Sequence, residues 1–253
     1  MLFSIWTKER YRPTRDADFL ATGNNSPERF VQIFKEIAAI EAEEDGVRFD
    51  PETVEAERIK EDADYEGVRV TFTAFLDTAE IPIQIDIGFG DAVRPEPVET
   101  EYPTLLDLPS PRVLAYPRES VISEKLEAMV KLGIANSRMK DFHDLHSLCT
   151  TFEFDGQTLV EAVRATFSQR GTELPVGGMP LAFTPEFYED ENKVRQWGAF
   201  CGKNKTYIQE LPFKDVIACL AAFLAPVIMS ARGERMLNSA WTPVNGWQPA
   251  IDK

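Results

Sequence analysis

The chain has 253 residues, of which 43% are hydrophobic and 27% charged, a composition typical of a folded protein with one large domain or two small ones. It lacks both an uninterrupted apolar run of about 18 residues and a basic leader at its start, so the sequence predicts neither a membrane-spanning helix nor a secretory signal. The net charge of −15 disfavours long-range attraction of nucleic acid, so an RNA substrate would need a local basic patch, whereas divalent cations and basic protein partners suit such a surface.

The first half of the chain predicts a small α/β unit. Residues 26–44 predict a helix, with Ser26 as the N-cap and Pro27 in the first turn. Residues 68–76 and 81–89 alternate between apolar and polar side chains, which predicts two strands joined by a hairpin through DTAE. The apolar stripe of the helix is Phe30, Ile33, Phe34, Ile37 and Ile40.

The second half of the chain is predicted to be helical. A proline-rich connector spans residues 95–117, and residues 170–183 and those after 238 are predicted to be loops. The predicted helices are 119–132, with Gly133 as a C-cap, 138–150, 157–169, about 185–200, and 212–230. The expected fold class is therefore α/β (α+β), with a mixed sheet in residues 1–115 followed by an all-helical domain in residues 116–253.

Three aspartates are the strongest candidates for a metal site. If DADF is a strand, Asp16 and Asp18 point to one side while Phe19 faces the core. Asp86 lies in mid-strand on the face opposite a stripe of isoleucines, so pairing of the two strands would bring three carboxylates together. Like charges this close favour a cation, and oxygen ligands suit Mg²⁺ or Mn²⁺. The alternative is that these aspartates face water or cap turns, and Asp91 is a weaker candidate of that turn type.

A second group of charged residues lies on two predicted helices. Lys125 borders an apolar seam, and Asp141 and Asp144 lie one turn apart on one face of the next helix. Lys125, Arg138 and Lys140 could each contact a nucleotide phosphate, and Asp141 could support them or bind a base. The alternative is that Lys125 only extends to solvent and the aspartates favour a helix N-terminus.

The remaining reactive side chains give weaker signals. His143 and His146 have a spacing that could bind a metal, but no matched third ligand accompanies them. The three cysteines show no CxxC spacing, so we expect reduced core thiols in a cytoplasmic protein rather than a disulfide or zinc framework. They are Cys149, Cys201 and Cys219.

Five ordered blocks resemble the AbiEii/AbiGii toxin family of nucleotidyltransferases. The blocks are RPTRDADFL, SPERFVQIFKEIAAIE, IPIQIDIGFGD, YPRESVISEKLEAMVKLG and SRMKDFHDLHSL, and they cover about residues 1–150. The resemblance implies a core like that of DNA polymerase β, a helical domain, NTP as the substrate and Mg²⁺ or Mn²⁺ as the cofactor. It further implies transfer of a nucleotide to an RNA acceptor such as the 3′ end of tRNA. It also implies a toxin of a toxin–antitoxin or abortive-infection system, with a winged-helix antitoxin as partner.

The resemblance assigns roles to individual residues. Asp16 and Asp18 match the DxD of the family, Lys125 matches the lysine of its second motif, and Asp141 matches the aspartate of its third. Asp86 as the third carboxylate rests on the strand argument. The expected cofactor-binding residues are Arg15, Lys125, Arg138, Lys140 and Asp144. Arg12 and Arg15 either contact phosphate or RNA near the metal or pair with acidic neighbours at the surface.

One expected element of the family precedes this region. Family members place there a strand that ends in KGG or KGA, whose backbone N–H groups bind the triphosphate. Since this sequence begins at MLFSIW, we expect that turn to be absent from it, through a late start site or a truncation. Three hypotheses therefore stay open: a nucleotidyltransferase toxin, a catalytically impaired remnant that binds only a partner protein, and a metal-dependent phosphohydrolase.

Overall fold

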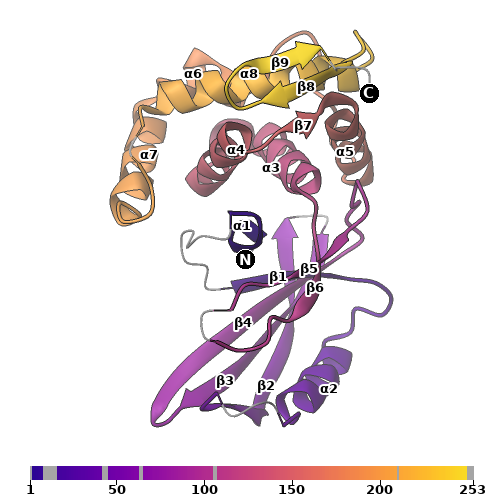
Figure 1. Cartoon of the computed structure of the whole chain (residues 1–253), viewed down its shortest axis with the longest axis vertical. Helices are drawn as coiled ribbons and strands as arrows, with labels where there is room; N and C mark the ends of the chain where they lie inside the picture. Colours follow the sequence, from indigo (N-terminus) through magenta and orange to yellow (C-terminus); the bar gives the residue numbers. More distant parts are fainter. Residues whose placement is uncertain are drawn as a thin grey trace. The chain divides into compact units, whose positions relative to one another are not determined.

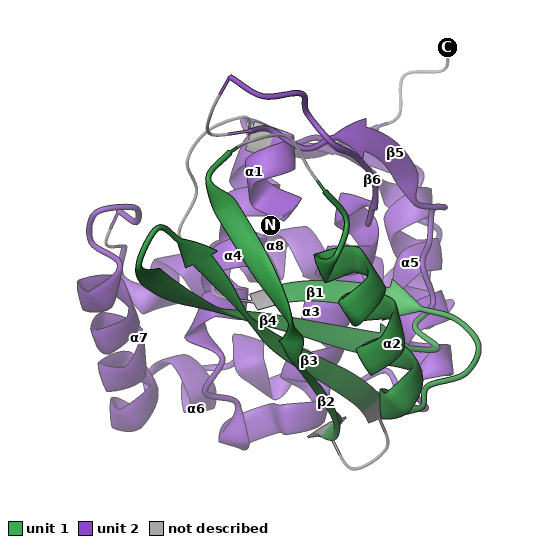
Figure 2. Ribbon diagram, turned by 90° about the horizontal axis from the view of Figure 1, so that it is seen from below, with its two compact units in different colours: residues 1, 13–91 green, residues 2–12, 92–253 purple. Residues whose placement is uncertain are grey.

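The computed structural model describes residues 2–7, 16–41, 45–62, 65–104, 107–209 and 211–249. The chain forms two compact units, of which unit 1 is Pro13–Asp91 with Met1 and unit 2 is Leu2–Arg12 with Ala92–Lys253 (Figure 2). The units divide after Asp91, whereas the sequence analysis places a domain boundary between residues 115 and 116, and that boundary stays a prediction.

Unit 1 contains a mixed four-stranded sheet with the order β1-β4-β3-β2 (Figure 1). Strand β1 runs parallel to β4, and the other two pairs are antiparallel. A mixed sheet together with helices confirms the predicted fold class, and β3 and β4 form the predicted hairpin, with Asp77 at φ 54° in its turn. The strands are β1 (Asp16–Ala21), β2 (Val47–Asp62), β3 (Tyr65–Leu76) and β4 (Ala79–Phe89).

Helix α2 (Pro27–Ala38) packs on the apolar face of this sheet. Phe30 is buried there in one cluster with β2, β3 and β4. Ser26 occupies the predicted N-cap position, although its side chain makes no capping hydrogen bond. The helix ends six residues before the predicted end at 44, and Ile37 and Ile40 are 50% and 67% exposed. Their prediction as core residues is therefore wrong, since Ile40 lies beyond the end of the helix and Ile37 lies in its last turn.

Strand β2 was not predicted, because its sequence carries many charges and a proline. It is an edge strand, paired only with β3. The pairing register shifts between Asp50 and Glu55, and Pro51 lies inside this irregularity, where a missing backbone N–H costs no ladder bond. Charged side chains on an edge strand also discourage pairing with another chain.

Unit 2 is mainly helical, but residues 116–253 are not all helical as predicted, because the described residues there include three short strands. The predicted helix at 185–200 is divided in two, because Asp190 starts a new helix by accepting hydrogen bonds from the backbone N–H groups of Asn192 and Lys193. Gly133 takes the C-cap position of α3 with φ 50°, as expected. The helices are α1 (Leu2–Thr7), α3 (Arg118–Leu132), α4 (Met139–Thr151), α5 (Gly156–Gln169), α6 (Pro185–Tyr188), α7 (Glu191–Lys203) and α8 (Phe213–Ala231).

Two small sheets lie where the sequence predicted a connector and a loop. Trp241 and Trp247 anchor the C-terminal hairpin, since their indole N–H groups donate to the carbonyl oxygens of Cys149 at 2.7 Å and Phe223 at 2.9 Å. The loop prediction after residue 238 is therefore wrong. The strands are β5 (Val98–Glu101) with β6 (Arg112–Ala115), and β7 (Phe154–Asp155), β8 (Ser239–Thr242) and β9 (Gly246–Pro249).

Helix α8 is a central element of the unit 2 core. Among the described residues it is the one helix that is long and apolar enough to cross a membrane by length and composition, a test that core helices also pass. Half of its apolar window is buried within the structure, and Leu220, Phe223 and Leu224 are fully buried in the core cluster. Its apolar character is therefore explained by packing against the other helices.

Candidate active site

Strands β1 and β4 bring two of the predicted carboxylates side by side. Asp18 is the register partner of Asp86 on the neighbouring parallel strand, and Asp16 is the partner of Gln84. Since partners on adjacent strands share a face, Asp16, Asp18 and Asp86 belong to one face of the sheet, as expected. The side chain of Asp16 lies outside the described residues. Phe19 lies on the opposite face with its partner Ile87, as expected, but it is 49% exposed rather than part of the core.

Asp86 forms a bidentate ion pair that the sequence analysis missed. Its register partner on β3 is Arg69, whose Nε and Nη2 donate to the two carboxylate oxygens at 2.7 and 2.8 Å. The amide of Gln84 approaches the same carboxylate at 3.3 Å. Asp86 is only 8% exposed, so this pairing offsets most of the cost of placing a charge in mid-strand. The ion pair therefore fixes the orientation of the Asp86 carboxylate.

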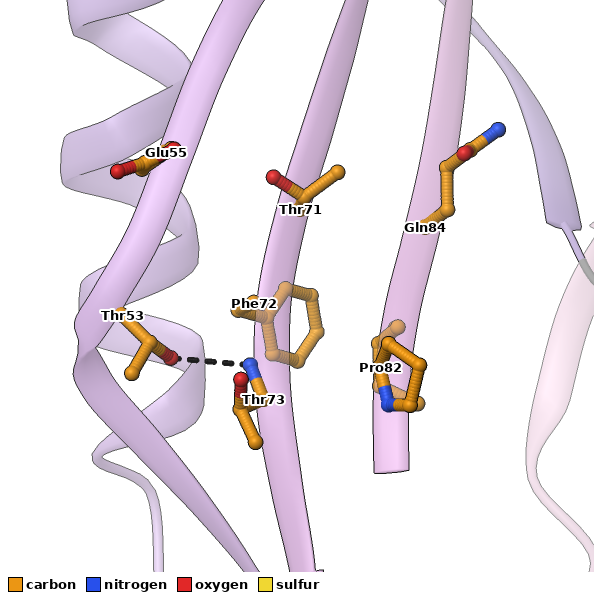
Figure 3. A pocket seen from close by; sticks show the side chains of 8 residues that line it. Thr53, Glu55, Thr71, Phe72, Thr73, Pro82 and Gln84 are labelled. Carbon is orange, nitrogen blue, oxygen red and sulfur yellow. Dashed lines mark hydrogen bonds between the residues drawn. The ribbon is translucent and has the colours of Figure 1, made fainter. Parts of the chain in front are cut away.

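The same polar face continues as a surface hollow away from Asp86. Figure 3 shows the hydroxyl groups of Thr53, Thr71 and Thr73 and the amide of Gln84 around it, with Glu55 at its margin. The Thr53 hydroxyl accepts a hydrogen bond from the backbone N–H of Thr73 at 2.9 Å (Figure 3). Hydroxyl and amide groups of this kind can bind a polar ligand. The polar face of the sheet therefore continues from the carboxylates into this hollow.

The donor set on this face fits a hard divalent cation. Asp18 and Asp86 lie on neighbouring strands, and Asp16 occupies the same face of β1. Both oxygens of Asp86 already accept hydrogen bonds from Arg69, so a cation there would share this carboxylate with the guanidinium group. Carboxylate oxygens with room for water are the ligands that Mg²⁺ and Mn²⁺ prefer. Among the side chains that the structure describes, no group of three His, Cys, Asp or Glu residues is assembled as a metal site. The metal role of the three aspartates stays a prediction.

Unit 2 contains a second cluster, centred on Lys125. The ammonium group of Lys125 on α3 lies 2.5 Å from Asp141 Oδ1 and 3.1 Å from Asp144 Oδ2, both on α4. Arg138, at the N-terminus of α4, donates from Nε to Asp141 Oδ2 at 2.7 Å. The two aspartate side chains are 2% exposed and that of Lys125 is 13% exposed. The alternative readings, in which Lys125 extends to solvent and the two aspartates only favour the helix N-terminus, do not describe the site fully. The three charged groups instead form one buried network.

The network keeps Lys125 charged. Burial by itself lowers the pKa of Lys125, but the charges and hydrogen bonds of Asp144 and Asp141 outweigh it, so the pKa is raised above the ordinary lysine value. An ammonium group has three N–H donors. Lys125 is therefore a fixed, largely buried positive charge between α3 and α4.

The other predicted residues lie as follows. Arg138 is close to Asp141, with a side chain 58% exposed, and Lys140 is exposed in the first turn of α4. His143 Nδ1 lies 3.7 Å from Oδ1 of Asp144, an aspartate of the Lys125 network, and its ring also contacts Phe200. Arg12 and Arg15 lie outside the described residues.

The fold and these clusters suggest a class of protein. Aspartates on neighbouring strands of a mixed sheet are an arrangement that metal-dependent phosphoryl-transfer and nucleotidyl-transfer enzymes use. Unit 2 contains in addition a buried lysine–aspartate network.

Comparison with known proteins gives the family. The family model for the nucleotidyl transferase AbiEii toxin of type IV toxin–antitoxin systems matches residues 1–219. The chain belongs to this family, which confirms the resemblance seen in the sequence, and it is a nucleotidyltransferase by family. An antitoxin is accordingly its expected partner.

Two solved structures from Helicobacter pylori are similar to the chain. The crystal structure of JHP933 has a TM-score of 0.46 and 14% sequence identity, and the match covers 88% of this chain and 79% of that one. A second structure, solved as a candidate nucleotidyltransferase, has a TM-score of 0.45 and 14% identity, with 88% and 81% covered. No match was found among curated proteins.

Proposed function

We propose that the chain transfers a nucleotide from an NTP to the 3′ end of an RNA acceptor, with tRNA as the expected acceptor. The observation that carries this proposal is the placement of Asp18 beside Asp86 on neighbouring strands, in a chain that belongs to a nucleotidyltransferase family. In this reaction the 3′ hydroxyl of the acceptor attacks the α-phosphorus of the NTP, the hydroxyl gives up its proton, and pyrophosphate leaves.

The sheet face is assigned to the reacting phosphate. Asp16, Asp18 and Asp86 would hold Mg²⁺ or Mn²⁺, which supplies charge neutralisation for the phosphate oxygens when bound. Arg69 is a positioning residue, because its two hydrogen bonds hold the Asp86 carboxylate in one orientation. The threonine-lined hollow on the same face offers hydroxyl groups for the polar parts of the NTP or the acceptor.

The Lys125 network is assigned to phosphate binding. Asp141 and Asp144 engage two of the three N–H donors of the ammonium group, and we assign the third to a phosphate oxygen. Asp141 acts through Lys125 by fixing its position and its charge. Arg138, Lys140 and the unplaced Arg15 are assigned to the outer phosphates or to RNA, which a chain of charge −15 can attract only through local basic groups.

The cellular role that we propose is that of a toxin in the cytoplasm, acting in phage defence by abortive infection. The family supports a toxin with an antitoxin partner. We propose a winged-helix protein as this antitoxin, and a basic surface on it would match the acidic charge of the chain.

The test is incubation of the purified chain with an α-labelled NTP, Mg²⁺ and tRNA. The proposal predicts labelled tRNA that requires both metal and enzyme. Release of inorganic phosphate without labelled RNA would instead support the phosphohydrolase hypothesis. Calorimetric NTP binding without transfer would show a nucleotide site with another acceptor, and the absence of any NTP binding would support the partner-binding alternative.

A further inference from the structure

Two of the three cysteines meet in unit 2, although they lie far apart in the sequence. Cys149 on α4 and Cys219 on α8 have their sulfur atoms 3.5 Å apart. Both are thiols in the structure. Disulfide bonding needs a sulfur–sulfur distance of about 2.05 Å, so a shift of roughly 1.5 Å would join them. The pair is therefore close to bonding geometry without being bonded.

The two thiols differ in exposure. Cys149 is fully buried, whereas Cys219 is half-buried and follows the exposed Ala218 on α8. A solvent-borne oxidant can therefore reach Cys219 first, with Cys149 directly behind it. This is the arrangement of an oxidant-reactive cysteine next to a resolving cysteine. The third cysteine, Cys201, is buried on α7.

The electrostatic surroundings favour a thiolate at Cys219. The hydrogen bond from the Cys149 thiol lowers the pKa of Cys219, and a hydrogen bond from His146, one turn before Cys149 on α4, lowers it further. The same contact and burial raise the pKa of Cys149, so Cys219 is the member of the pair that loses its proton more readily. Since the thiolate is the nucleophile, Cys219, the more accessible of the two cysteines, is also the more reactive one.

We propose that Cys149 and Cys219 are a peroxide-responsive pair, in which a hydroperoxide oxidises Cys219 and Cys149 then closes a reversible disulfide between α4 and α8. In the first step the Cys219 sulfur attacks a peroxide oxygen; an S–O bond forms, the O–O bond breaks, and the leaving hydroxide takes up a proton to become water. In the second step the Cys149 sulfur attacks the Cys219 sulfur; the S–S bond forms, the S–O bond breaks, and the proton of Cys149 leaves with hydroxide as a second water. Two thiols are oxidised and one peroxide is reduced, and a dithiol reverses the bond.

The disulfide bond would link α4 to α8, and both helices are structurally important in unit 2. Helix α4 carries Asp141 and Asp144, the partners of Lys125, and α8 is the central core helix. The disulfide would close a loop over a sequence separation of 70 residues. This proposal rests on the geometry of unit 2 and is independent of the proposed function, so the failure of either leaves the other standing.

The test uses the reduced full-length chain treated with hydrogen peroxide and then denatured for thiol counting. The count should fall from three to one and return to three with dithiothreitol, and peptide mapping should show a cross-link between the peptides of Cys149 and Cys219. A Cys201→Ser control should go from two thiols to none. In Cys149→Ser, dimedone should label Cys219.

Several results would overturn the proposal. A thiol count that stays at three, a cross-link that contains Cys201, or a loss of thiols that dithiothreitol does not reverse would each contradict it. Dimedone labelling of Cys149 in a Cys219→Ser variant, with no labelling of Cys219 in Cys149→Ser, would reverse the assigned roles and contradict it as well. If Cys149→Ser fails to fold, the peptide map of the cross-link in the unmodified chain is sufficient to test the proposal.

Discussion

Replacing Lys125 by methionine removes the ammonium group while keeping most of the apolar part of the side chain. The change leaves Asp141 and Asp144, each with a side chain 2% exposed, without the ammonium group that lies 2.5 and 3.1 Å from them. Removing one partner of a buried ion pair costs about 3–5 kcal/mol in the free energy of unfolding. Arg138 still pairs with Asp141 at 2.7 Å, so we expect a loss near the lower end, about 3 kcal/mol.

Thermal unfolding followed by tryptophan fluorescence measures this loss in the relevant unit. All four tryptophans, including Trp197, Trp241 and Trp247, belong to unit 2. A loss of about 3 kcal/mol corresponds to a fall in melting temperature of roughly 6–12 °C for a protein of this size. The matched control is Lys131→Met, an exposed lysine on the same helix, which should change stability by less than about 0.5 kcal/mol.

The dependence on pH provides a second readout of the same network. The pKa of Lys125 is raised in the folded chain, so its stabilising charge is fully present below the ordinary lysine pKa of 10.5. That contribution is lost only as the pH rises through the raised pKa. The difference in melting temperature between the unmodified chain and Lys125→Met should therefore be the same at about pH 7 and about pH 9. A Lys125→Met variant with the same melting temperature as Lys131→Met would refute the reasoning.

Further predictions concern the sheet, a helix cap and the cysteine pair. Arg69→Met should lower metal-dependent nucleotide transfer roughly 10–100-fold by releasing the Asp86 carboxylate, while Arg48→Met, an exposed arginine of the same sheet, should leave it unchanged in a labelling assay. Asp155→Ala removes the N-cap of α5, whose side chain accepts from the Thr158 backbone N–H at 2.8 Å, and should cost about 1 kcal/mol in urea unfolding. The peroxide-treated chain should unfold with about 4 kcal/mol more stability than the reduced chain, since its disulfide spans 70 residues, and equal urea midpoints would contradict this.

The sequence predicted the carboxylate face because strand alternation determines which side chains share a face. That rule places Asp18 and Asp86 together once β1 and β4 are paired, and the structure shows that they are paired. Arg69 could not be inferred in the same way, because its partner depends on the register of β3 against β4. An arginine in an alternating strand reads equally well as a side chain that faces solvent.

The elements that were missed share a physical cause. Strand β2 is stabilised by pairing with β3 and carries Pro51 at a register shift, so its local sequence resembles a polar loop. The C-terminal hairpin is held by the indole groups of Trp241 and Trp247, which bind carbonyl groups of distant helices. In the same way, the sequence showed Lys125, Asp141 and Asp144 as separate candidates, and only the packing of α3 against α4 joins them.

The central claim is that the carboxylates on the β1–β4 face carry out nucleotide transfer, and one comparison tests it most directly. Labelled tRNA is measured for the unmodified chain, for Asp18→Asn and for Asp77→Asn, a control aspartate exposed in the turn of the neighbouring hairpin. Asp18→Asn should lose transfer by on the order of 100-fold or more at unchanged melting temperature, while Asp77→Asn should label RNA normally. Full transfer by Asp18→Asn would contradict the account.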